Sequence, residues 1–590
     1  MKQTTTIRIG GEGGEGVISA GEILTLTSAR FGWHIFSSRT YPAEIKGGLA
    51  VYQFRISEAQ VGSQGDQLDI AVCLTAEAYD ECRADVSPNT YIVFDPMEIA
   101  IEKIQSGKAI PIPFTEIAKK QVGAAMSKNA VVVGVLARFI GLPLELASTI
   151  FTAKFGNKRA ASTMMEANAK AIHIGYELAA GQNINLRPQG TPSPENRLVL
   201  SGNQAIALGA LAANCKYVAG YPITPATPIL ETLARELPKF DGSFVQTEDE
   251  MAALASCLGA GFAGVRAMTA TSGPGFALMS ELMSLGVMAE VPVVIVNVQR
   301  AGPSTGMPTK TEQGDLLYAL YGSPGESPRI VLAPATVTEA FSLMPEAFTI
   351  AELVQCPVIV LSDQSLGYRL ETVSRGAISI PEISQVGDSS DAAENDTPFL
   401  RYRDTASGVS PHGVPGTASP VFIVGGLEHN EAGQPDYTPE NHLRMAAKRE
   451  RKLAVVKTRA AWQLGWERAG IENGIGIISW GSTFGVVDEA IRMLELTLEE
   501  KFGHFHVRWI NPFPIEEISA WADCFARVFV VEENFSGQLE TLLRAQTNLT
   551  PVSIRKSAGV PFAASEIHNR IVENIKGKLH GVPQAVRLPG

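Results

Sequence analysis

Three stretches of the chain alternate short apolar, β-type runs with helical segments, and this alternation restricts the fold more than any other feature. The stretches cover residues 1–185, 197–372 and 471–590. A strand–helix–strand order implies parallel sheets with crossover helices. At 590 residues the chain is too long for one hydrophobic core, so we expect a multidomain α/β protein.

Two polar segments separate these units. Residues 186–196, LRPQGTPSPEN, have the proline-rich, polar composition of a linker. Residues 373–470 form an irregular insertion with the acidic run GDSSDAAEND, followed by a connecting helix for which Thr438, Pro439 and Glu440 provide a good N-terminus. We expect that helix to present a solvated basic face, made of Lys448, Arg449, Arg451 and Lys452.

Composition argues against several classes of function. A formal charge of −12 disfavours binding to nucleic acids and to anionic membranes. The N-terminus lacks the apolar core of a secretory signal, and the most apolar stretch, Asn129 to Phe151, is broken by charges and a proline. Scattered cysteines without a C-x-x-C indicate buried free thiols in a reducing cytoplasm and no iron–sulfur cluster held by this chain alone. They are Cys73, Cys82, Cys215, Cys257, Cys356 and Cys524.

A glycine-rich turn follows the first expected strand. Residues 11–16, GEGGEG, fit the G-x-G-x-x-G pattern of dinucleotide sites. Such a site also needs an acid at the end of the next strand, where this chain has Ser37, Ser38 and Arg39. Glu12 would in addition repel a phosphate. The pattern therefore predicts a tight strand–helix turn rather than an NAD or FAD site.

Two segments of the second unit place polar groups after expected strands. In YPITP, from Tyr221, the prolines stiffen the backbone around Thr224, although a rigid turn alone would give the same pattern. Arg300 ends an apolar strand, and a guanidinium there suits bidentate recognition of a carboxylate. Ligands of open α/β sheets bind beyond the carboxyl ends of strands, so both positions are candidates for a site.

Three acids, Glu248, Asp249 and Glu250, precede an alanine-rich helix expected over Asp249–Ala263. Acids in a first helical turn are favoured by the helix dipole, and capping alone would explain them. A carboxylate placed beside a basic heterocycle would instead relay a proton. The residues alone leave both alternatives open.

Four motifs in order carry a resemblance to a known family. YPITP, TEDEMAALAS, TATSGPGFALMSE and VQRAGPSTGMPTKTEQGDL resemble the thiamine diphosphate pyrimidine-binding domain of 2-oxoacid:ferredoxin oxidoreductases. The last unit, with ISWGSTFGVVDEA, WINPFP and VVEENFSGQL, is similar to that family's transketolase-C-like domain. The first unit, with GGEGGEGV and YPAEIKGG, resembles its Rossmann-like gamma domain, which many members carry fused ahead of the alpha portion.

The resemblance implies roles for particular residues. Glu248 corresponds to the glutamate that activates thiamine diphosphate, with Glu250 as the alternative. Arg300 and Thr224 correspond to the groups that bind the carboxylate and the 2-keto group of the substrate. Further substrate contacts are implied for Tyr221 and Lys46, and further cofactor contacts for Pro222, Ile223, Thr271, Ser272 and Gly273.

What the chain lacks implies a partner. No Gly-Asp-Gly for the Mg²⁺–diphosphate half-site occurs, and cluster cysteines are absent. In split members of the family a beta subunit carries both features. The resemblance therefore implies an (alpha–beta)2 assembly in which thiamine diphosphate and Mg²⁺ are shared with the beta subunit, [4Fe-4S] clusters lie in it, ferredoxin docks through it, and coenzyme A is a co-substrate.

Substrate and reaction class stay open at this point. The fused layout resembles members that act on 2-oxoglutarate, but pyruvate, branched-chain oxoacids and indolepyruvate share the carboxylate that Arg300 would bind. A cation for a distal carboxylate is either Lys46, where the family commonly has arginine, or a partner residue. A non-redox thiamine enzyme predicts a partner without clustered cysteines, and a non-catalytic scaffold predicts full activity after Glu248→Gln.

Overall fold

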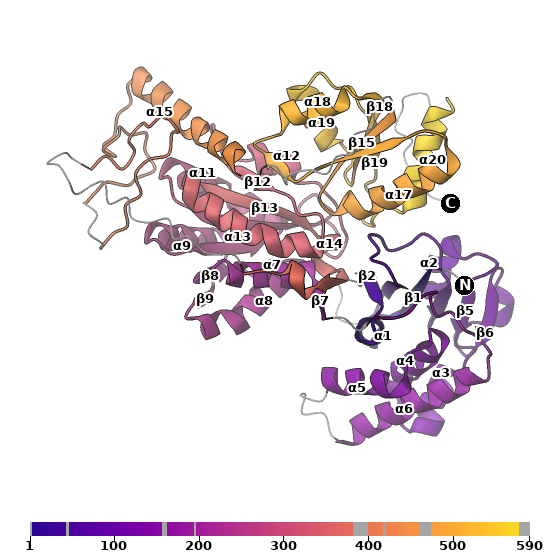
Figure 1. The fold of residues 1–590 in the computed structure, drawn as a ribbon. Coiled ribbons are helices and arrows are strands. Elements are labelled where there is room, and N and C mark those ends of the chain that lie inside the picture. Colours follow the sequence, from indigo (N-terminus) through magenta and orange to yellow (C-terminus); the bar gives the residue numbers. More distant parts are fainter. Residues whose placement is uncertain are drawn as a thin grey trace.

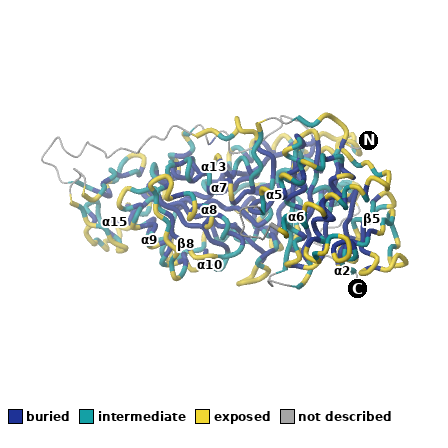
Figure 2. The backbone as a smooth tube through the Cα atoms, turned by 90° about the horizontal axis from the view of Figure 1, so that it is seen from below, coloured by how far each residue is buried: buried dark blue, intermediate teal, exposed yellow. Residues whose placement is uncertain are grey.

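The computed structural model describes residues 3–42, 47–155, 162–193, 196–380, 399–416, 421–459, 462 and 474–577. Its strands form three sheets of eight, seven and four strands, with helices packed against them (Figure 1). The expected multidomain α/β fold is confirmed. Dark-blue buried backbone runs through the first and second units in Figure 2, and exposed backbone lies at the surface.

The first sheet is mixed rather than parallel. Its order is β6-β5-β4-β1-β3-β2-β14-β7, and β3 pairs antiparallel with both β1 and β2. The expectation of a parallel sheet is wrong here because the connection between β2 and β3 is too short to contain a crossover helix. The strands of the N-terminal unit are β1 (Thr4–Glu12), β2 (His34–Thr40), β3 (Leu49–Ser57), β4 (Ile70–Cys73), β5 (Tyr91–Phe94) and β6 (Lys108–Pro111).

Helices cover this sheet with an apolar face. The buried side of α1 packs against β3, and α4 packs closely on α6 because Gly134 and Gly175 leave no side chain between the two backbones. The helices are α1 (Val17–Phe31), α2 (Ala76–Cys82), α3 (Phe114–Glu116), α4 (Lys128–Phe139), α5 (Leu144–Phe155) and α6 (Ser162–Ala180), with a π-helical turn at Ile117–Val122.

Two strands that bracket the second unit complete the first sheet. β7 (Arg197–Ser201) and β14 (Leu370–Ser374) pair antiparallel with each other, and β14 also pairs with β2. Side chains reinforce the seam: Thr372 Oγ1 lies 2.9 Å from His34 Nδ1. The amide of Leu370 donates to Ser37 Oγ at 3.0 Å. The sheet therefore crosses from the first unit into the second.

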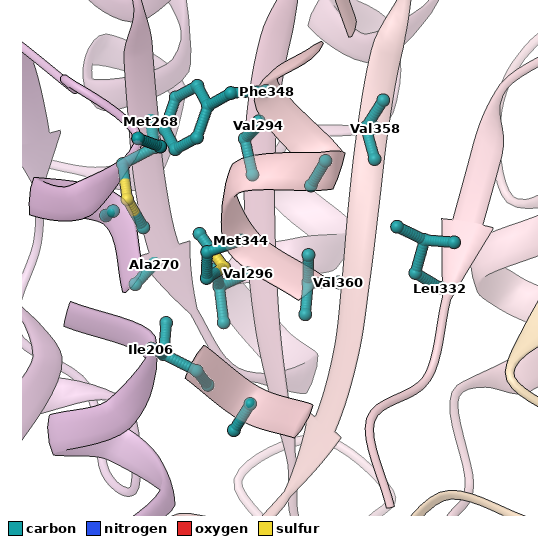
Figure 3. Packing of buried hydrophobic residues seen from close by; sticks show 14 of the residues in the cluster. Ile206, Met268, Ala270, Val294, Val296, Leu332, Met344, Phe348, Val358 and Val360 are labelled. Atoms are coloured by element: carbon teal, nitrogen blue, oxygen red, sulfur yellow. The ribbon is translucent and has the colours of Figure 1, made fainter. Parts of the chain in front are cut away.

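The second sheet has the order β17-β12-β13-β11-β10-β8-β9, and all its strands except β17 are parallel. Figure 3 shows Phe348 of α13 (Val337–Val354) beside Met268 and Val294, and Met344 of the same helix beside Val296. The strands are β8 (Tyr217–Gly220), β9 (Ser243–Gln246), β10 (Ala267–Thr271), β11 (Val293–Gln299), β12 (Ile330–Leu332) and β13 (Pro357–Asp363).

The helices of this unit lie on both faces of the sheet (Figure 1). Each parallel strand is followed by a helix or a turn at its carboxyl end, as crossover connections require. The helices are α7 (Gly202–Ala212), α8 (Thr227–Glu236), α9 (Glu250–Phe262), α10 (Gly273–Leu278), α11 (Ser280–Met288), α12 (Leu316–Tyr321), α13 (Val337–Val354) and α14 (Gln364–Tyr368).

The third sheet is parallel, with the order β16-β15-β18-β19. One strand expected over His506–Ile510 is in fact two, because the chain leaves this sheet after Val507 and adds β17 to the second sheet. The elements are β15 (Gly474–Trp480), β16 (Phe502–Val507), β17 (Trp509–Asn511), β18 (Phe525–Glu532), β19 (Val552–Arg555), α17 (Phe484–Thr497), α18 (Ile515–Ala522), α19 (Gln538–Gln546) and α20 (Ala564–Ile575).

The helix of the insertion, α15 (Pro439–Arg451), does not carry a solvated basic face. Lys448 and Lys452 are fully buried and both bind the buried carboxylate of Glu290, the second at 3.2 Å. Arg449 is also buried and pairs with Glu428. The expectation is wrong for Lys448, Lys452 and Arg449, because Glu290, 158 residues from Lys448, and Glu428 pair with them, and helix periodicity does not reveal such partners. Arg451 is partly exposed and pairs with Asp404.

We predict that Glu290→Gln strongly destabilises the attachment of the insertion. The substitution leaves Lys448 and Lys452 buried without their counter-ion, which costs about 3–5 kcal/mol. The measurement is the thermal unfolding midpoint together with protease sensitivity of the 399–459 segment. Glu236→Gln, on the solvent-facing pair with Lys239, is the control and should change stability by less than about 1 kcal/mol. Equal stability of the two variants would refute a structural role for the buried cluster.

Five of the six cysteines are buried free thiols, as expected, but Cys524 is exposed. It lies just after α18, where the chain turns outward toward β18. Among the residues that the structure describes, no helix is long and apolar enough to cross a membrane.

Candidate active site

The carboxyl ends of four neighbouring strands, β11, β10, β8 and β9, meet at one edge of the second sheet. YPITP follows β8, the three acids follow β9, and Arg300 follows β11. Thr271 ends β10, and Ser272 and Gly273 follow it. Parallel pairing therefore gathers the candidate residues of the second unit at one edge.

The three acids after β9 have three different environments. The side chain of Asp249 caps α9 by accepting a hydrogen bond from the amide of Ala252 at 2.7 Å. Glu250 lies in the first turn of α9 and is buried. Glu248 caps nothing and is exposed at the sheet edge. Helix capping thus accounts for Asp249 and leaves the carboxylate of Glu248 available for a ligand.

Glu250 lies behind the edge rather than on it. A β-carbon added to Gly275 would come within 2.3 Å of both Glu250 Oε1 and Thr271 Oγ1, so this glycine makes room for the two polar groups. Burial raises the pKa of Glu250 above its usual value. The arrangement fits a carboxyl that shapes the floor of the site.

Arg300 is buried and holds the YPITP segment. Its Nη1 donates to the carbonyl oxygen of Thr224 at 2.6 Å, and its Nε is buried without a partner among the described residues. Burial lowers the pKa of Arg300 from its usual value, and the charge of Asp315 opposes that shift. A buried guanidinium with a free donor is prepared to receive an anion.

A cleft of about 540 Å³ opens beside Arg300. Sequence reasoning missed Asp315, which lines this cleft and accepts a hydrogen bond from Asn297 Nδ2 at 2.9 Å. Burial raises the pKa of Asp315, whereas the hydrogen bond from Asn297 lowers it. In the sequence, Asp315 stands in the segment QGDL, and its spacing from the other motifs does not indicate a role in the site. The loop after β11 folds back and brings this carboxylate to the cleft beside Arg300.

The motifs of the first unit meet each other. The amide of Gly13 donates to the carbonyl oxygen of Gly48 at 2.8 Å, so the glycine-rich turn contacts the K-G-G segment. Gly14 and Gly16 have positive φ, in line with the predicted tight strand–helix turn. Lys46, the expected distal cation, lies outside the described residues.

This first unit reaches the second at Tyr368 of α14. The guanidinium of Arg39 stacks over the Tyr368 ring at 4.7 Å, and Tyr41 contacts the same ring. Arg39 and Tyr368 line a second cavity of about 330 Å³, to which the last unit contributes Lys556. All three units therefore border one cavity.

The residues at the edge fit the pyrimidine half of thiamine diphosphate. Thr269 Oγ1 and Ser272 Oγ are buried without hydrogen-bond partners among the described residues, and unsatisfied buried hydroxyls of this kind indicate a missing ligand or water. Glu248 stands at the rim of the same edge. No group of three or more metal-ligating side chains occurs within the described ranges.

The last unit docks on the active-site loop through Gln313. Its amide donates to the carbonyl oxygen of Glu533 at 2.6 Å, and its side-chain oxygen accepts from the Glu533 amide at 2.9 Å. Burial, together with the charge of Asp363, raises the pKa of the Glu533 carboxyl to about 8. The seam between the units thus holds a carboxyl that is neutral below that pH.

We predict that this seam weakens as the pH rises. The folded Glu533 keeps its proton up to about pH 8, whereas the unfolded carboxyl loses it near 4.5, so the folded state binds more protons in that window. Stability therefore falls from about pH 5 to pH 8, by on the order of a few kcal/mol. Glu533→Gln should flatten this dependence in thermal unfolding measured from pH 5 to 9. An unchanged slope would mean that Glu533 does not titrate there.

Three family models cover most of the chain. The thiamine diphosphate-binding model of pyruvate flavodoxin/ferredoxin oxidoreductases matches residues 208–448. The pyruvate ferredoxin/flavodoxin oxidoreductase model matches residues 6–178, and core domain II of pyruvate:ferredoxin oxidoreductase matches residues 474–560. A curated relative, the 2-oxoglutarate oxidoreductase subunit KorA of Mycobacterium tuberculosis, is 31% identical over 99% of this chain and 93% of its own.

The chain belongs to the 2-oxoacid:ferredoxin oxidoreductase family.

Two further comparisons agree with this membership. The subunit alpha of 2-oxoacid:ferredoxin oxidoreductase 2 of Aeropyrum pernix is 31% identical over 95% of this chain and 96% of its own. A solved structure of 2-oxoglutarate:ferredoxin oxidoreductase from Magnetococcus marinus, with 2-oxoglutarate, coenzyme A and succinyl-CoA bound, matches with a TM-score of 0.89. It is 37% identical and covers 98% of this chain and 100% of that chain. The resemblance stated from the motifs is confirmed.

Proposed function

We propose that the chain is the alpha subunit of a 2-oxoacid:ferredoxin oxidoreductase that acts on 2-oxoglutarate. The reaction is oxidative decarboxylation with coenzyme A to acyl-CoA, CO2 and reduced ferredoxin, or its reversal. The observation that carries the proposal is the meeting of Glu248, Thr224 and Arg300 at the edge formed by β8, β9, β10 and β11. Relatives named for 2-oxoglutarate support the choice of substrate.

Each side chain has a distinct task in this proposal. Arg300 binds the substrate carboxylate through the donors that Thr224 does not use. The Thr224 hydroxyl orients the 2-keto group, and Tyr221 borders the substrate at the exposed rim. Lys46 is the candidate for the distal carboxylate of 2-oxoglutarate. The guanidinium of Arg300 and the hydroxyl of Thr224 together fix the reacting carbonyl in one orientation.

Glu248 holds the proton that the cofactor exchanges. When bound, thiamine diphosphate supplies a carbon nucleophile and an electron sink for decarboxylation. The carboxylate of Glu248 hydrogen-bonds the aminopyrimidine ring and relays a proton to it. Pro222 and Ile223, together with Thr271, Ser272 and Gly273, are the residues that would hold the ring when the cofactor is bound.

A beta subunit completes the site. It carries the Mg²⁺–diphosphate half-site and the [4Fe-4S] clusters, and ferredoxin docks on it, in an (alpha–beta)2 assembly. Exposed apolar side chains support a partner on this face: Phe535, which lines the 540 Å³ cleft, is 81% exposed, and Met251, beside Glu248, is 45% exposed. Leaving such groups in water is unfavourable, and a covering chain would remove them from it.

The cavity of about 330 Å³ among the three units is the proposed place for coenzyme A. Arg39, Tyr368 and Lys556 supply cationic and aromatic surface of the kind that a nucleotide phosphate and base require. Reduced free thiols, with no disulfide among the described residues, support a cytoplasmic enzyme.

The experiment is co-expression of the chain with the candidate beta subunit from a neighbouring reading frame. We expect the purified complex to reduce a viologen dye only when 2-oxoglutarate, coenzyme A and thiamine diphosphate are all present. Succinyl-CoA should appear with a stoichiometry of one per two electrons. A complex that forms but decarboxylates without reducing the dye would indicate a non-redox thiamine enzyme instead.

A further inference from the structure

The cleft beside Arg300 is acidic. Its charged lining side chains are one cation, Arg300, and two carboxylates, Glu312 and Asp315. Neither carboxylate forms an ion pair with a lysine or arginine in the part of the chain that the structure describes. The cleft therefore carries more negative than positive charge on the side of Arg300 that faces the last unit.

Both carboxylates are held in place. Asp315 accepts a hydrogen bond from Asn297, and its amide donates to Gln299 Oε1 at 2.9 Å. Asn297 and Gln299 belong to β11, the strand that leads directly into Arg300. The strand β11 thus positions both Arg300 and Asp315, so a rigid strand sets the distance between these two charges.

Glu312 is held by the loops on either side. Its Oε1 accepts from the hydroxyl of Ser557, and its Oε2 accepts from the amide of Gly302 at 3.4 Å. Ser557 follows β19 of the last unit, and Gly302 follows Arg300 itself. Glu312 is therefore a fixed part of the cleft wall rather than a freely moving surface side chain.

Arg300 also contacts a segment without charged side chains. Its guanidinium contacts the backbone of Thr224, within the segment from Tyr221 to Pro225, which carries no charge. Arg300 is 7% exposed, and its Nε has no partner among the described residues, so it is built to take a ligand. Arg300 is thus the one cation that lines this cleft, beside two carboxylates and in contact with the Thr224 backbone.

We propose that Glu312 and Asp315 determine the orientation of a dicarboxylate substrate. The keto-acid head lies on Arg300, and the two carboxylates repel the distal carboxylate out of the cleft that they line. Like charges in a partly buried cleft repel more strongly than in bulk water, so an orientation that places the distal carboxylate in this cleft is disfavoured. This inference rests on the proposed function.

The test compares two substrates of equal chain length in the alpha–beta complex. 2-Oxoglutarate carries a distal carboxylate, and 2-oxopentanoate does not. Asp315→Asn keeps the acceptor for Asn297 but removes the charge, so the wrong orientation becomes accessible to 2-oxoglutarate alone. For the Asp315→Asn complex, we expect both kcat and KM for 2-oxoglutarate to fall by about fivefold. The change is measured relative to the change that the same variant shows with 2-oxopentanoate. Calorimetric affinity for 2-oxoglutarate should rise by a similar factor.

Two further variants sharpen the test. Glu312→Gln should give the same split between the substrates, which provides a second measurement if Asp315→Asn fails to assemble. Asp488→Asn, on the exposed face of α17, should leave both substrates unchanged. Equal effects of the wall variants on both oxoacids would overturn the inference alone. A wild-type complex inactive with every 2-oxoacid would overturn the proposed function, and the inference with it.

Discussion

Glu248→Gln should reduce turnover of the alpha–beta complex by about 10²- to 10⁴-fold, the contribution expected of a positioned proton relay. Glutamine preserves the shape of the side chain but cannot accept and return a proton. Glu248 is exposed and makes no contact that supports the fold, so assembly should be unaffected. The measurement is viologen reduction by the complex, with size-exclusion chromatography to verify assembly.

Two variants decide between the acids of this turn. Glu236→Gln, on the solvent face of the preceding helix α8, is the control and should keep full activity. Glu250→Gln should lower activity less than Glu248→Gln, because the Glu250 carboxyl lies behind the edge next to Thr271. If Glu250→Gln abolished turnover while Glu248→Gln did not, the proton relay would belong to Glu250.

Arg300→Lys should lower kcat/KM for 2-oxoglutarate by about 100-fold. Lysine retains the positive charge but loses the planar fork, so it cannot hold the Thr224 carbonyl and a substrate carboxylate together. The loss should be shared by every 2-oxoacid, because all of them present the same carboxylate. Arg492→Lys, on an exposed pair with Asp488, is the matched control and should be neutral.

The KM values for a panel of 2-oxoacids distinguish carboxylate binding by Arg300 from a purely structural role. If Arg300 only held the loop, Arg300→Lys would lower thermal stability and affect kcat without a rise in KM. A normal KM for 2-oxoglutarate in a folded Arg300→Lys complex would contradict carboxylate binding at this position.

Several central strands could be predicted because local pattern and tertiary role agree. β10 lies over Ala267–Thr271 and β4 over Ile70–Cys73, as their apolar runs predicted. Parallel strands share a carboxyl edge, so YPITP after β8 and Arg300 after β11 could be taken as candidates for one site before any coordinates were known. The strand β9, which leads to Glu248, was not predicted.

The features that could not be predicted depend on contacts between residues that are far apart in the sequence. Nothing local distinguishes Lys448 on α15 from a solvated lysine, because its partner Glu290 lies on another unit. Asp315 could not be assigned to the site from the sequence around it. It reaches Arg300 only because the loop after β11 folds back onto that strand. The antiparallel part of the first sheet was missed because strand alternation does not reveal the direction of a short connection.

The pairing of β14 with β2 has a consequence for how such a chain can be divided. A cut between α6 and β7 would leave β2 and β14 as bare edges on separate polypeptides, each with unpaired main-chain groups facing water. Thr372 meets His34 and Leu370 meets Ser37 along these edges, so the two pieces carry matching surfaces. We therefore expect that gene fission at this point would yield two subunits that associate by completing a common sheet.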